Sequence, residues 1–248
     1  VTVVDPVMND GGWHFTNPEP LYGFKFLREL YYKANPDYNA RFTVPVLWDK
    51  KEETIVNNES SEIIRMLINF KNYAKRPGLD FYPISLRSEI DEINSWIYDQ
   101  VNNGVYKTGF ATSQEVYEKE CRSLFSALDR LENILSQQEW LAGDGKTLTE
   151  ADIRLFVTLI RWDPTYHSHF KCNLKTFPYQ YPALTSFVRR LYQIPLIKKT
   201  VNFDHIITHY YASHRTINPT GIVPLSRGYN YDDVPVKSLY LPQELSNL

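Results

Sequence analysis

The spacing of apolar residues changes near residues 75–83, and this change favours a chain built in two parts. Before it, short apolar runs alternate with turns; after it, apolar residues recur at helical spacing over long segments. The stretch AKRPGLDFYP between them has the proline, glycine and charge content of a linker. The chain has 248 residues, enough to bury a substantial core in one or two domains. We therefore predict an α/β domain over 1–76, an all-helical domain over 84–216 and an extended tail over 217–248.

The first part carries strand and helix signals in turn. VTVV at 1–4 predicts a buried strand, and residues 21–33 and 60–70 have the apolar spacing of helices. VPVLWD (44–49) and TIVN (54–57) lie close enough to form an antiparallel hairpin across the polar residues between them. This order of a strand, a helix, a hairpin and a helix fits the second half of a small α/β domain.

The second part is dominated by helical patterns. The predicted helices cover residues 84–101, 114–137, 147–162, 182–192 and 203–213. The third of these is apolar on nearly every side, so we expect it to lie at the centre of the domain. Thr149 and Asp152 form a Thr-x-x-Asp capping box at its start, which we interpret as structural.

Composition argues against several classes of protein. A formal net charge of −2, from 27 basic and 29 acidic residues, gives no indication of a surface for nucleic acid or for an anionic membrane. The sequence has no run of about 20 apolar residues to span a membrane and no signal-peptide pattern. Cys121 and Cys172 are the only cysteines, which argues against a disulfide framework and favours a reducing compartment. We predict that this compartment is the cytoplasm.

The cysteines and histidines do not suggest a metal site. The H-x-H-x-x-C string that ends at Cys172 lacks the four ligands typical of a structural metal site, and no second cluster is evident. Three further histidines fall near helical spacing but have no acidic partners at matching positions: His205, His209 and His214. Cys121 lies in an amphipathic helical pattern beside polar residues. We therefore interpret both cysteines as inert structural residues and expect no bound metal.

Val44–Pro45 raises the first question about a ligand, because a proline inside a strand removes a backbone donor from the sheet. The simpler interpretation is an edge strand with a trans bond, since only about 5–6% of X–Pro bonds are cis. The alternative is a cis bond that turns the Val44 backbone outward. Its N–H and C=O would then pair with a bound peptide, as an added strand does.

Glu59–Ser60 stands at the start of the second predicted helix and also has two interpretations. Serine is a good N-cap, so simple capping of the helix explains the pair. A helix N-terminus also attracts a carboxylate, and the Glu59 carboxylate beside it could hold an ammonium group. The second interpretation predicts a site for the head group of a free amino acid.

Longer strings of the sequence resemble one known family. They are GGWHF, LYGFKFLRELYYKANPDYNARFTVPVLWDKK, TIVNNESSEIIRM, NNGVYKTGFA and ADIRLFVTLIRWDPTYHSHFKCN. These strings are similar to the glutathionyl-hydroquinone reductases, which are Xi-class glutathione transferases related to the Omega class. The similarity runs over essentially the whole chain. It implies a thioredoxin-like glutathione-binding domain followed by an all-helical transferase domain.

The resemblance also implies an enzyme activity, the glutathione-dependent reduction of glutathionyl-hydroquinones to hydroquinones. In this family a cysteine attacks the glutathione sulfur of the conjugate, and a second glutathione resolves the mixed disulfide. Glutathione is then a co-substrate, quinone and hydroquinone conjugates are the ligands, and no metal is needed. The resemblance further implies a homodimer.

Single residues take roles from the same resemblance. The implied glutathione contacts are Trp13, Arg41, Val44, Pro45, Glu59 and Ser60. Tyr106 and Tyr166 match tyrosines that contact the hydroquinone, where a phenol can hydrogen-bond an oxygen atom and act as a weak acid. For Tyr106 taken alone, packing of a loop is the simpler interpretation.

The sequence departs from the family pattern at the nucleophile. The family carries a Cys-Pro-Trp motif after its first strand, ahead of a helix whose N-terminus lowers the pKa of the thiol. No such motif occurs here. We expect the catalytic cysteine, with the first strand and helix of the thioredoxin-like domain, to lie upstream of Val1. Two alternatives stay open: a non-catalytic protein that binds glutathione or another ligand, and an interaction module with a transferase fold.

Overall fold

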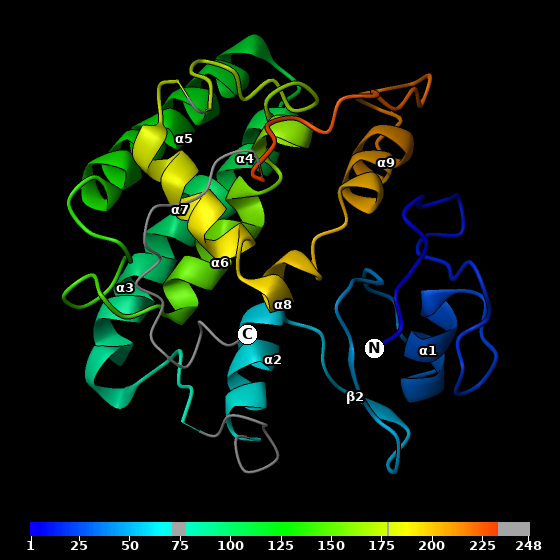
Figure 1. Ribbon diagram of the computed structural model, residues 1–248. Coiled ribbons are helices and arrows are strands. Elements are labelled where there is room, and N and C mark those ends of the chain that lie inside the picture. Colours follow the sequence, from blue (N-terminus) through cyan, green and yellow to red (C-terminus); the bar gives the residue numbers. More distant parts are fainter. Residues whose placement is uncertain (71–77, 178, 233–248) are drawn as a thin grey trace. The chain divides into compact units, whose positions relative to one another are not determined.

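The contacts between residues divide the chain into two compact units, Val1–Gly78 and Leu79–Leu248 (Figure 1). The computed structural model describes residues 1–70, 78–177 and 179–232. Within these residues no helix is long and apolar enough to cross a membrane. The predicted linker and tail lie partly outside the described residues, at 75–77 and at 233–248. The domain boundaries given by the sequence stay predictions.

The first unit combines two helices with a small sheet. Its elements are α1 (Leu27–Ala34), β1 (Leu47–Asp49), β2 (Thr54–Asn57) and α2 (Ser60–Ile68). The two strands are antiparallel, with Trp48 opposite Ile55, so the predicted hairpin is confirmed. Both predicted helices are present, although each is shorter than its apolar pattern.

Two predictions about this unit are wrong. Residues 1–4 form no strand, and Val1 and Val3 are exposed, because no described strand lies beside them to pair with their backbone. Pro45 precedes β1 and does not stand inside it. The sheet therefore loses no backbone donor to this proline.

The start of α1 is later than the pattern over 21–33 predicts, and Glu19 is the reason. Its carboxylate accepts hydrogen bonds from three backbone N–H groups of this stretch, those of Leu21, Tyr22 and Phe24, at 2.7, 2.8 and 3.1 Å. A side chain that binds the backbone in this way competes with helix formation. Gly23 in the same turn has a φ of +74°, which a helix does not allow. The helix can begin only after this turn.

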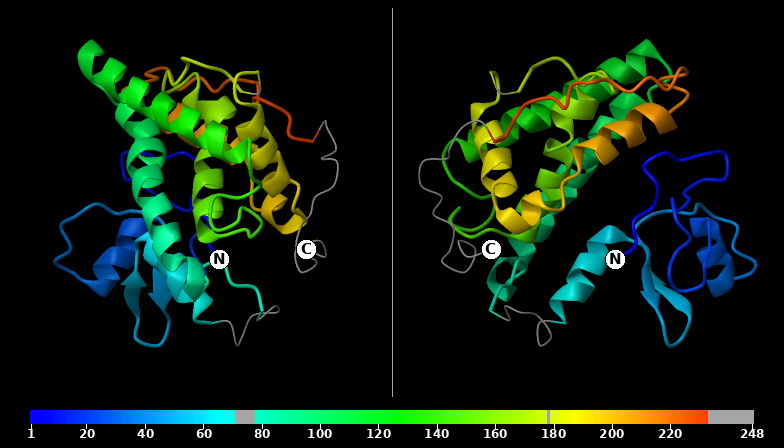
Figure 2. Two further views of the ribbon diagram at one scale, coloured as in Figure 1. Left: turned by 90° about the vertical axis from the view of Figure 1, so that its left-hand side faces the viewer. Right: turned by 45° about the vertical axis from the view of Figure 1, so that its right-hand side comes forward.

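The second unit is all-helical (Figure 2). Its α-helices are α3 (Arg87–Ile97), α4 (Gly104–Gly109), α5 (Gln114–Leu135), α6 (Glu150–Leu159), α7 (Pro182–Tyr192), α8 (Pro195–Lys198) and α9 (Phe203–Ser213). Three further short helical turns are η2 (Ile84–Leu86), η3 (Tyr98–Asn102) and η4 (Trp162–Tyr166), of which the last two are π-helical. Each helix that the sequence predicts for this unit is present. The sequence missed α4 and α8, which have only 6 and 4 residues and so show no periodic pattern.

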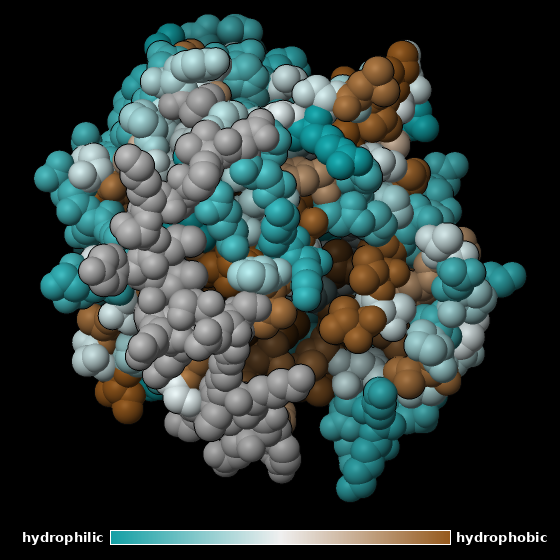
Figure 3. Space-filling model, in the orientation of Figure 1, coloured by the Kyte–Doolittle hydropathy of each residue, from teal (hydrophilic) through white to brown (hydrophobic). Residues whose placement is uncertain are grey.

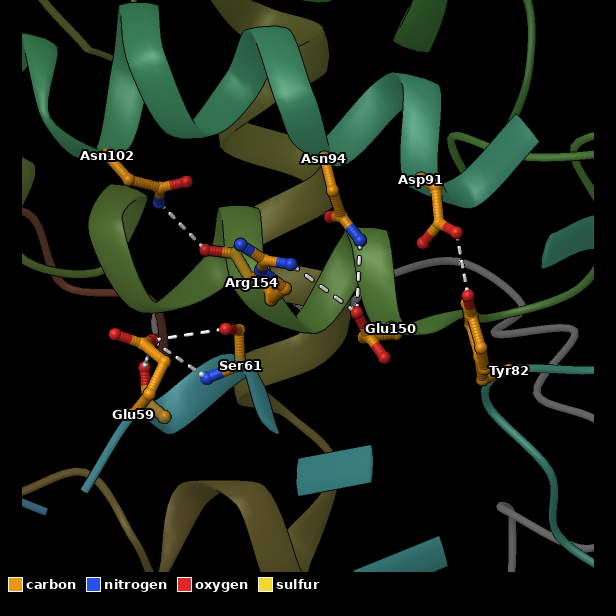
Figure 4. A network of polar contacts seen from close by, with 9 residues as sticks. Glu59, Ser61, Tyr82, Asp91, Asn94, Asn102, Glu150 and Arg154 are labelled. Atoms are coloured by element: carbon orange, nitrogen blue, oxygen red, sulfur yellow. Dashed lines mark hydrogen bonds and ion pairs between the residues drawn. The ribbon is translucent and has the colours of Figure 1, made fainter. Parts of the chain in front are cut away.

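Helix α6 lies in the core of this unit, as its apolar sequence predicts. Leu155 and Leu159 on it are fully buried. The carboxylate of Glu150 in its first turn accepts a hydrogen bond from Asn94 Nδ2 on α3 at 3.0 Å and lies 3.5 Å from Arg154 Nη1 (Figure 4). A buried carboxylate needs such partners, because removing the partner of a buried charge costs about 3–5 kcal/mol.

The predicted capping box at the start of α6 is confirmed. Asp152 Oδ2 accepts hydrogen bonds from the Thr149 N–H at 2.8 Å and from the Thr149 hydroxyl at 2.9 Å, while Oδ1 accepts from the Leu141 N–H at 2.8 Å. Asp152 is completely buried, and burial raises the pKa of its carboxyl to about 6, although these three donors act in the opposite direction. The carboxylate therefore fastens the loop before α6 to the helix itself.

The chain after α9 has no regular structure as far as residue 232. Ile222 and Leu225 in it are exposed, and the surface where this loop lies, at the upper right of Figure 3, is apolar. Farther along, Tyr231 is buried and the Tyr229 N–H donates to Asp163 Oδ2 at 3.1 Å. This last described stretch is thus packed against η4.

We expect Asp152→Asn to destabilise the helical unit by about 1–3 kcal/mol at pH 7, because an amide group in place of one carboxylate oxygen leaves a buried donor without an acceptor. Urea unfolding followed by circular dichroism measures the change. The same substitution at the exposed Asp144 in the loop before α6 should change the stability by less than about 0.5 kcal/mol. Equal effects of the two substitutions would contradict the assignment.

The same variants test the raised pKa. The folded state holds the Asp152 proton to about pH 6, whereas an unfolded aspartate releases it near pH 4. Fewer protons are then bound by the unfolded state in this window, so the stabilising contribution of this group is present at low pH and is lost as pH rises from about 4 through about 6. Asp152→Asn should lack this part of the pH dependence, and Asp144→Asn should keep it.

Candidate functional site

The first half of the candidate site is the N-terminus of α2. Glu59 is the N-cap residue, and its Oε1 accepts hydrogen bonds from the Ser61 N–H and the Ser61 hydroxyl, both at 3.1 Å (Figure 4). The Ser60 hydroxyl lies 3.3 Å from the same oxygen. Glu59 therefore takes the capping position that the simpler sequence interpretation gave to Ser60, which is the first helical residue. A carboxylate is stabilised there by the positive end of the helix dipole.

Val44 and Pro45 lie on the chain that leads into β1. The peptide bond between them is cis, as the second sequence interpretation requires, and the pairing of Val44 with a ligand stays a prediction. The Val44 side chain is 41% exposed. Within the described residues no hydrogen bond is formed by the N–H or the C=O of Val44. Both groups are thus available to pair with the backbone of a peptide-like ligand.

Tyr31 joins these two stretches of chain, and sequence reasoning missed this role. Its side chain is 1% exposed, and its hydroxyl donates to the C=O of Thr43 at 2.6 Å and accepts from Asn58 Nδ2 at 3.1 Å. Thr43 directly precedes Val44, and Asn58 directly precedes Glu59. One buried hydroxyl therefore holds the two halves of this surface in a fixed relation. The only signal in the sequence is a tyrosine on the apolar face of a helix, which needs a partner for its hydroxyl.

Trp13 and Arg41 lie in the loops of the same unit. Trp13 is half-buried, and its C=O accepts from the Leu27 N–H at 3.0 Å. Arg41 is exposed, and its C=O accepts from the Tyr38 hydroxyl at 2.9 Å. The backbone of both residues is anchored in this way, and the predicted contacts of their side chains with glutathione stay predictions.

The second unit contains a chain of three phenol groups, which we call the tyrosine chain: Tyr106, Tyr210 and Tyr166. The Tyr210 hydroxyl lies 2.6 Å from the Tyr106 hydroxyl and 2.7 Å from the Tyr166 hydroxyl. The three side chains come from α4, α9 and η4. The two tyrosines singled out by the sequence thus meet through a third, Tyr210, which sequence reasoning did not mark because it lies inside an ordinary helical pattern.

The tyrosine chain runs from the surface into the core. Tyr106 is 40% exposed, whereas Tyr210 and Tyr166 are 4% and 2% exposed. Burial raises the pKa of both inner phenols well above the usual range for tyrosine. Both hydroxyl groups are therefore protonated at neutral pH.

The number of protons limits what the tyrosine chain can offer to a ligand. Each phenol has a single O–H proton, and Tyr210 has a hydroxyl neighbour on both sides. If Tyr210 donates to Tyr106 and accepts from Tyr166, the Tyr106 proton is free to point outward. The exposed end of the chain can then donate one hydrogen bond to an oxygen atom of a ligand.

Aromatic rings surround the exposed end of the tyrosine chain. The Tyr106 and Phe110 rings on α4 are parallel within 6°, with centroids 6.5 Å apart, and Phe110 is 44% exposed. The edge of Phe170 meets both rings, at 5.4 and 5.3 Å. Gly109 makes room for this ring, since a Cβ atom there would lie 2.2 Å from Phe170 Cγ. Such a face is suited to a flat apolar ligand.

Neither cysteine has the properties of a nucleophile. Cys121 and Cys172 are free thiols, 2% and 0% exposed, and burial raises the pKa of both. Both thiols are therefore protonated at neutral pH. Among the described residues, no group of three or more potential metal ligands is arranged to hold a metal ion.

Comparison with known proteins agrees with these features. Residues 114–190 match the family described as glutathione S-transferase, C-terminal domain. Glutathionyl-hydroquinone reductase YqjG of Escherichia coli is 51% identical over 239 residues, which cover 94% of this chain and 72% of that protein.

Solved structures are similar as well. The glutathione-bound structure of YqjG has a TM-score of 0.88 at 51% identity and covers 94% of this chain and 77% of that one. The structure of glutathione S-transferase Xi from Phanerochaete chrysosporium has a TM-score of 0.88 at 53% identity and covers 91% of this chain and 79% of that one.

The fold is that of a glutathione transferase, in which a thioredoxin-like domain is followed by an all-helical domain. Within this class, the chain belongs to the family of Xi-class glutathione transferases and glutathionyl-hydroquinone reductases. The protein is therefore an enzyme of the glutathione transferase family with a glutathione-dependent function. The family resemblance of the sequence is confirmed.

We expect Tyr31→Phe to weaken glutathione binding about three- to tenfold, because Thr43 and Asn58 lose the hydroxyl group that joins them and a hydrogen bond contributes about 1 kcal/mol. Calorimetric titration with glutathione measures the change. Tyr32→Phe is the matched control, since Tyr32 is the next residue on α1 and is 42% exposed. Unchanged affinity in Tyr31→Phe would remove Tyr31 from the site.

Proposed function

We propose that the protein reduces glutathionyl-hydroquinones to hydroquinones with glutathione, through a mixed disulfide between an enzyme cysteine and glutathione. The observation that carries the proposal is the tyrosine chain with its one exposed phenol, set in an aromatic face that fits a hydroquinone ring. The name of the relative YqjG points to the same reaction. A homodimer in the cytoplasm belongs to the same proposal and rests on the family resemblance.

In this proposal the first unit binds glutathione. The N–H and C=O of Val44 pair with the cysteinyl part of the ligand, since neither group has another partner in the described residues. The Glu59 carboxylate and the Ser60 hydroxyl, both exposed at the N-terminus of α2, hold the amino-acid head group. Pro45, Trp13 and Arg41 complete this contact set, with Arg41 and Trp13 at the glycyl end and the backbone of glutathione.

The proposed reaction moves the glutathionyl group from a ring carbon of the conjugate to the sulfur of the enzyme cysteine. A cysteine thiolate attacks the glutathione sulfur of the conjugate, the C–S bond to the ring breaks, and its electron pair stays on the ring carbon, which takes up a proton. The new S–S bond joins enzyme and glutathione. The thiolate of a second glutathione then forms glutathione disulfide and releases the enzyme thiolate. Two glutathionyl sulfurs are oxidised and the ring is reduced, so the electrons balance.

Tyr106 is proposed to hydrogen-bond a hydroquinone oxygen and to act as a weak acid there. Tyr106 is the exposed member of the tyrosine chain, and its hydroxyl lies 2.6 Å from that of Tyr210, so Tyr210, backed by Tyr166, can donate a hydrogen bond to the Tyr106 oxygen when the Tyr106 proton is shared with the ligand. Tyr166, which is buried, takes part through this chain.

The nucleophile is proposed to lie outside the printed sequence, upstream of Val1, in a Cys-Pro-Trp motif. The support is chemical: a thiolate is needed for attack on sulfur, and burial keeps Cys121 and Cys172 as neutral thiols.

We expect Tyr106→Phe in the full-length protein to lower kcat/KM for a glutathionyl-hydroquinone about 10- to 100-fold, because the donor to the ring oxygen is lost. Steady-state kinetics and calorimetric titration with glutathione separate the two steps, and the glutathione affinity should stay within about twofold. Tyr98→Phe is the control, since Tyr98 is also about half exposed, at 47%, and lies outside the tyrosine chain. Equal kinetics of the two variants would remove Tyr106 from the reaction.

We expect full-length Cys121→Ala and Cys172→Ala to keep kcat within about threefold, because neither thiol forms a thiolate at neutral pH. Replacing the upstream cysteine should abolish turnover and leave glutathione binding in place. A folded Cys172→Ala variant with no turnover would show that the nucleophile is misplaced. A full-length wild-type protein that binds glutathione but turns over no conjugate would overturn the proposed reaction.

A further inference from the structure

Two neighbouring side-chain contacts join η4 and the residues just after it to the C-terminal end of α9. The first is the contact between the Tyr166 and Tyr210 hydroxyls at 2.7 Å. The second joins His169 Nε2 to His214 Nδ1 at 3.2 Å. His169 follows Tyr166 by three residues and His214 follows Tyr210 by four, so the two contacts are about one helical turn apart. We call the second contact the histidine pair.

The histidine pair is packed into the same aromatic cluster as the tyrosine chain. His169 is 5% exposed, and its ring lies against Tyr211 with centroids 4.6 Å apart. His214 stacks on Phe170 at 5.7 Å and 16°, and the Tyr210 ring meets it edge-on at 5.3 Å. A displacement of either imidazole would therefore displace the ring of Tyr210, since a close-packed interior has no free space to absorb it.

The histidine pair is uncharged at neutral pH. Burial, together with the nearby ionisable group His209, lowers the pKa of both imidazoles to about 4, and Lys171 adds to this effect for His169. Two neutral imidazoles 3.2 Å apart form an N–H···N hydrogen bond, in which one ring donates and the other accepts. The pair thus holds the end of α9 against the residues after η4 without placing a charge beside the phenols.

We propose that His169 and His214 are positioning residues of the reductase site: their hydrogen bond fixes the Tyr210 hydroxyl between those of Tyr106 and Tyr166. The inference rests on the proposed function. A hydroxyl chain with contacts of 2.6 and 2.7 Å tolerates little displacement, because a shift of about 1 Å breaks the hydrogen bond and misplacement of this size can cost about 100-fold in rate. The other end of α9 is held separately, by Arg227 and Asp204 at 2.8 Å.

The test uses substitutions that keep or remove the bonding atom in the full-length protein. His169→Gln places an amide near the position of Nε2, and His214→Asn places one near Nδ1, so both can retain the hydrogen bond. His169→Leu and His214→Leu keep the size of the side chain but remove the bond. His205→Leu on the first turn of α9 is the matched control.

We expect the two leucine variants at 169 and 214 to lower kcat for a glutathionyl-hydroquinone about 5- to 20-fold. The amide variants should stay within about threefold of wild type, and the glutathione affinity of all variants should stay within about twofold. The double leucine variant should be no slower than either single variant, because both remove one bond. Leucine variants with wild-type kcat, or amide variants as slow as the leucine variants, would overturn the proposal.

A second measurement needs no turnover and separates this inference from the proposed function. The protein is labelled with carbon-13 at Cζ of tyrosine, the carbon that carries the hydroxyl. The nuclear magnetic resonance signal of Tyr210 is assigned by its absence in Tyr210→Phe, and it reports on the Tyr210 hydroxyl. This signal should move in the leucine variants at 169 and 214, return in the amide variants and stay in place in His205→Leu. If the wild-type protein turns over no conjugate, the proposed reductase function fails, and the Tyr210 signal alone tests the role of the two histidines. A signal that moves in the leucine variants and returns in the amide variants supports positioning of Tyr210. A signal that does not move in the leucine variants overturns it.

Discussion

The hydroxyl group of Tyr210 is the contact on which the candidate substrate site depends. It joins side chains from α4, η4 and α9, three elements that are separated in the sequence by up to 104 residues. A buried hydroxyl needs a partner, because an unpaired one costs about 1–3 kcal/mol. The tyrosine chain meets this need only when all three elements are in place. The arrangement that stabilises the helical unit is therefore the same one that leaves a phenol at its surface.

The first unit uses the same device at a different site. Tyr31 is buried, and its hydroxyl is shared by Thr43 and Asn58, so it fixes the chain ahead of Val44 and Glu59. In both units a buried tyrosine hydroxyl contacts residues that lead to, or carry, exposed candidate site groups. A substitution of either buried tyrosine should thus change the positions of exposed residues. A list of the exposed residues alone is therefore an incomplete description of either candidate site.

The sequence predicts long periodic elements well and short or irregular ones poorly. The patterns over 182–192 and 203–213 agree with α7 and α9 to the residue, since many apolar positions at one spacing outweigh local effects. The six residues of α4 hold two glycines and no repeat, although they carry Tyr106. The predicted strand at 1–4 fails for a related reason: strand formation depends on pairing, and a sequence pattern does not contain the partner.

The features of the candidate sites also fall into two groups, those that the sequence indicates and those that only the tertiary structure shows. Local chemistry predicts a helix start at Glu59–Ser60 and leaves the cis bond at Val44–Pro45 as one of two alternatives, and the structure has both features. Local chemistry favours serine as the cap, whereas in the structure the Glu59 side chain turns back and accepts from the Ser61 N–H. Tyr210, His169 and His214 are joined only by the tertiary structure. No spacing rule connects positions 169 and 214, so this contact could not be predicted.

Burial acts in the same direction on the inner phenols and on the thiols of the helical unit. A low-dielectric environment raises the pKa of a phenol and of a thiol alike, since it disfavours the anion in both cases. For Tyr166 and Tyr210 this keeps the hydroxyl protons in place, so both phenols can serve as hydrogen-bond donors. For Cys172, in the same unit, it prevents formation of the thiolate that attack on sulfur requires. A thiolate needs the opposite environment, with a helix N-terminus or a cation beside it and access to the ligand. The packing that keeps Tyr166 and Tyr210 protonated therefore also keeps the thiols of Cys121 and Cys172 protonated.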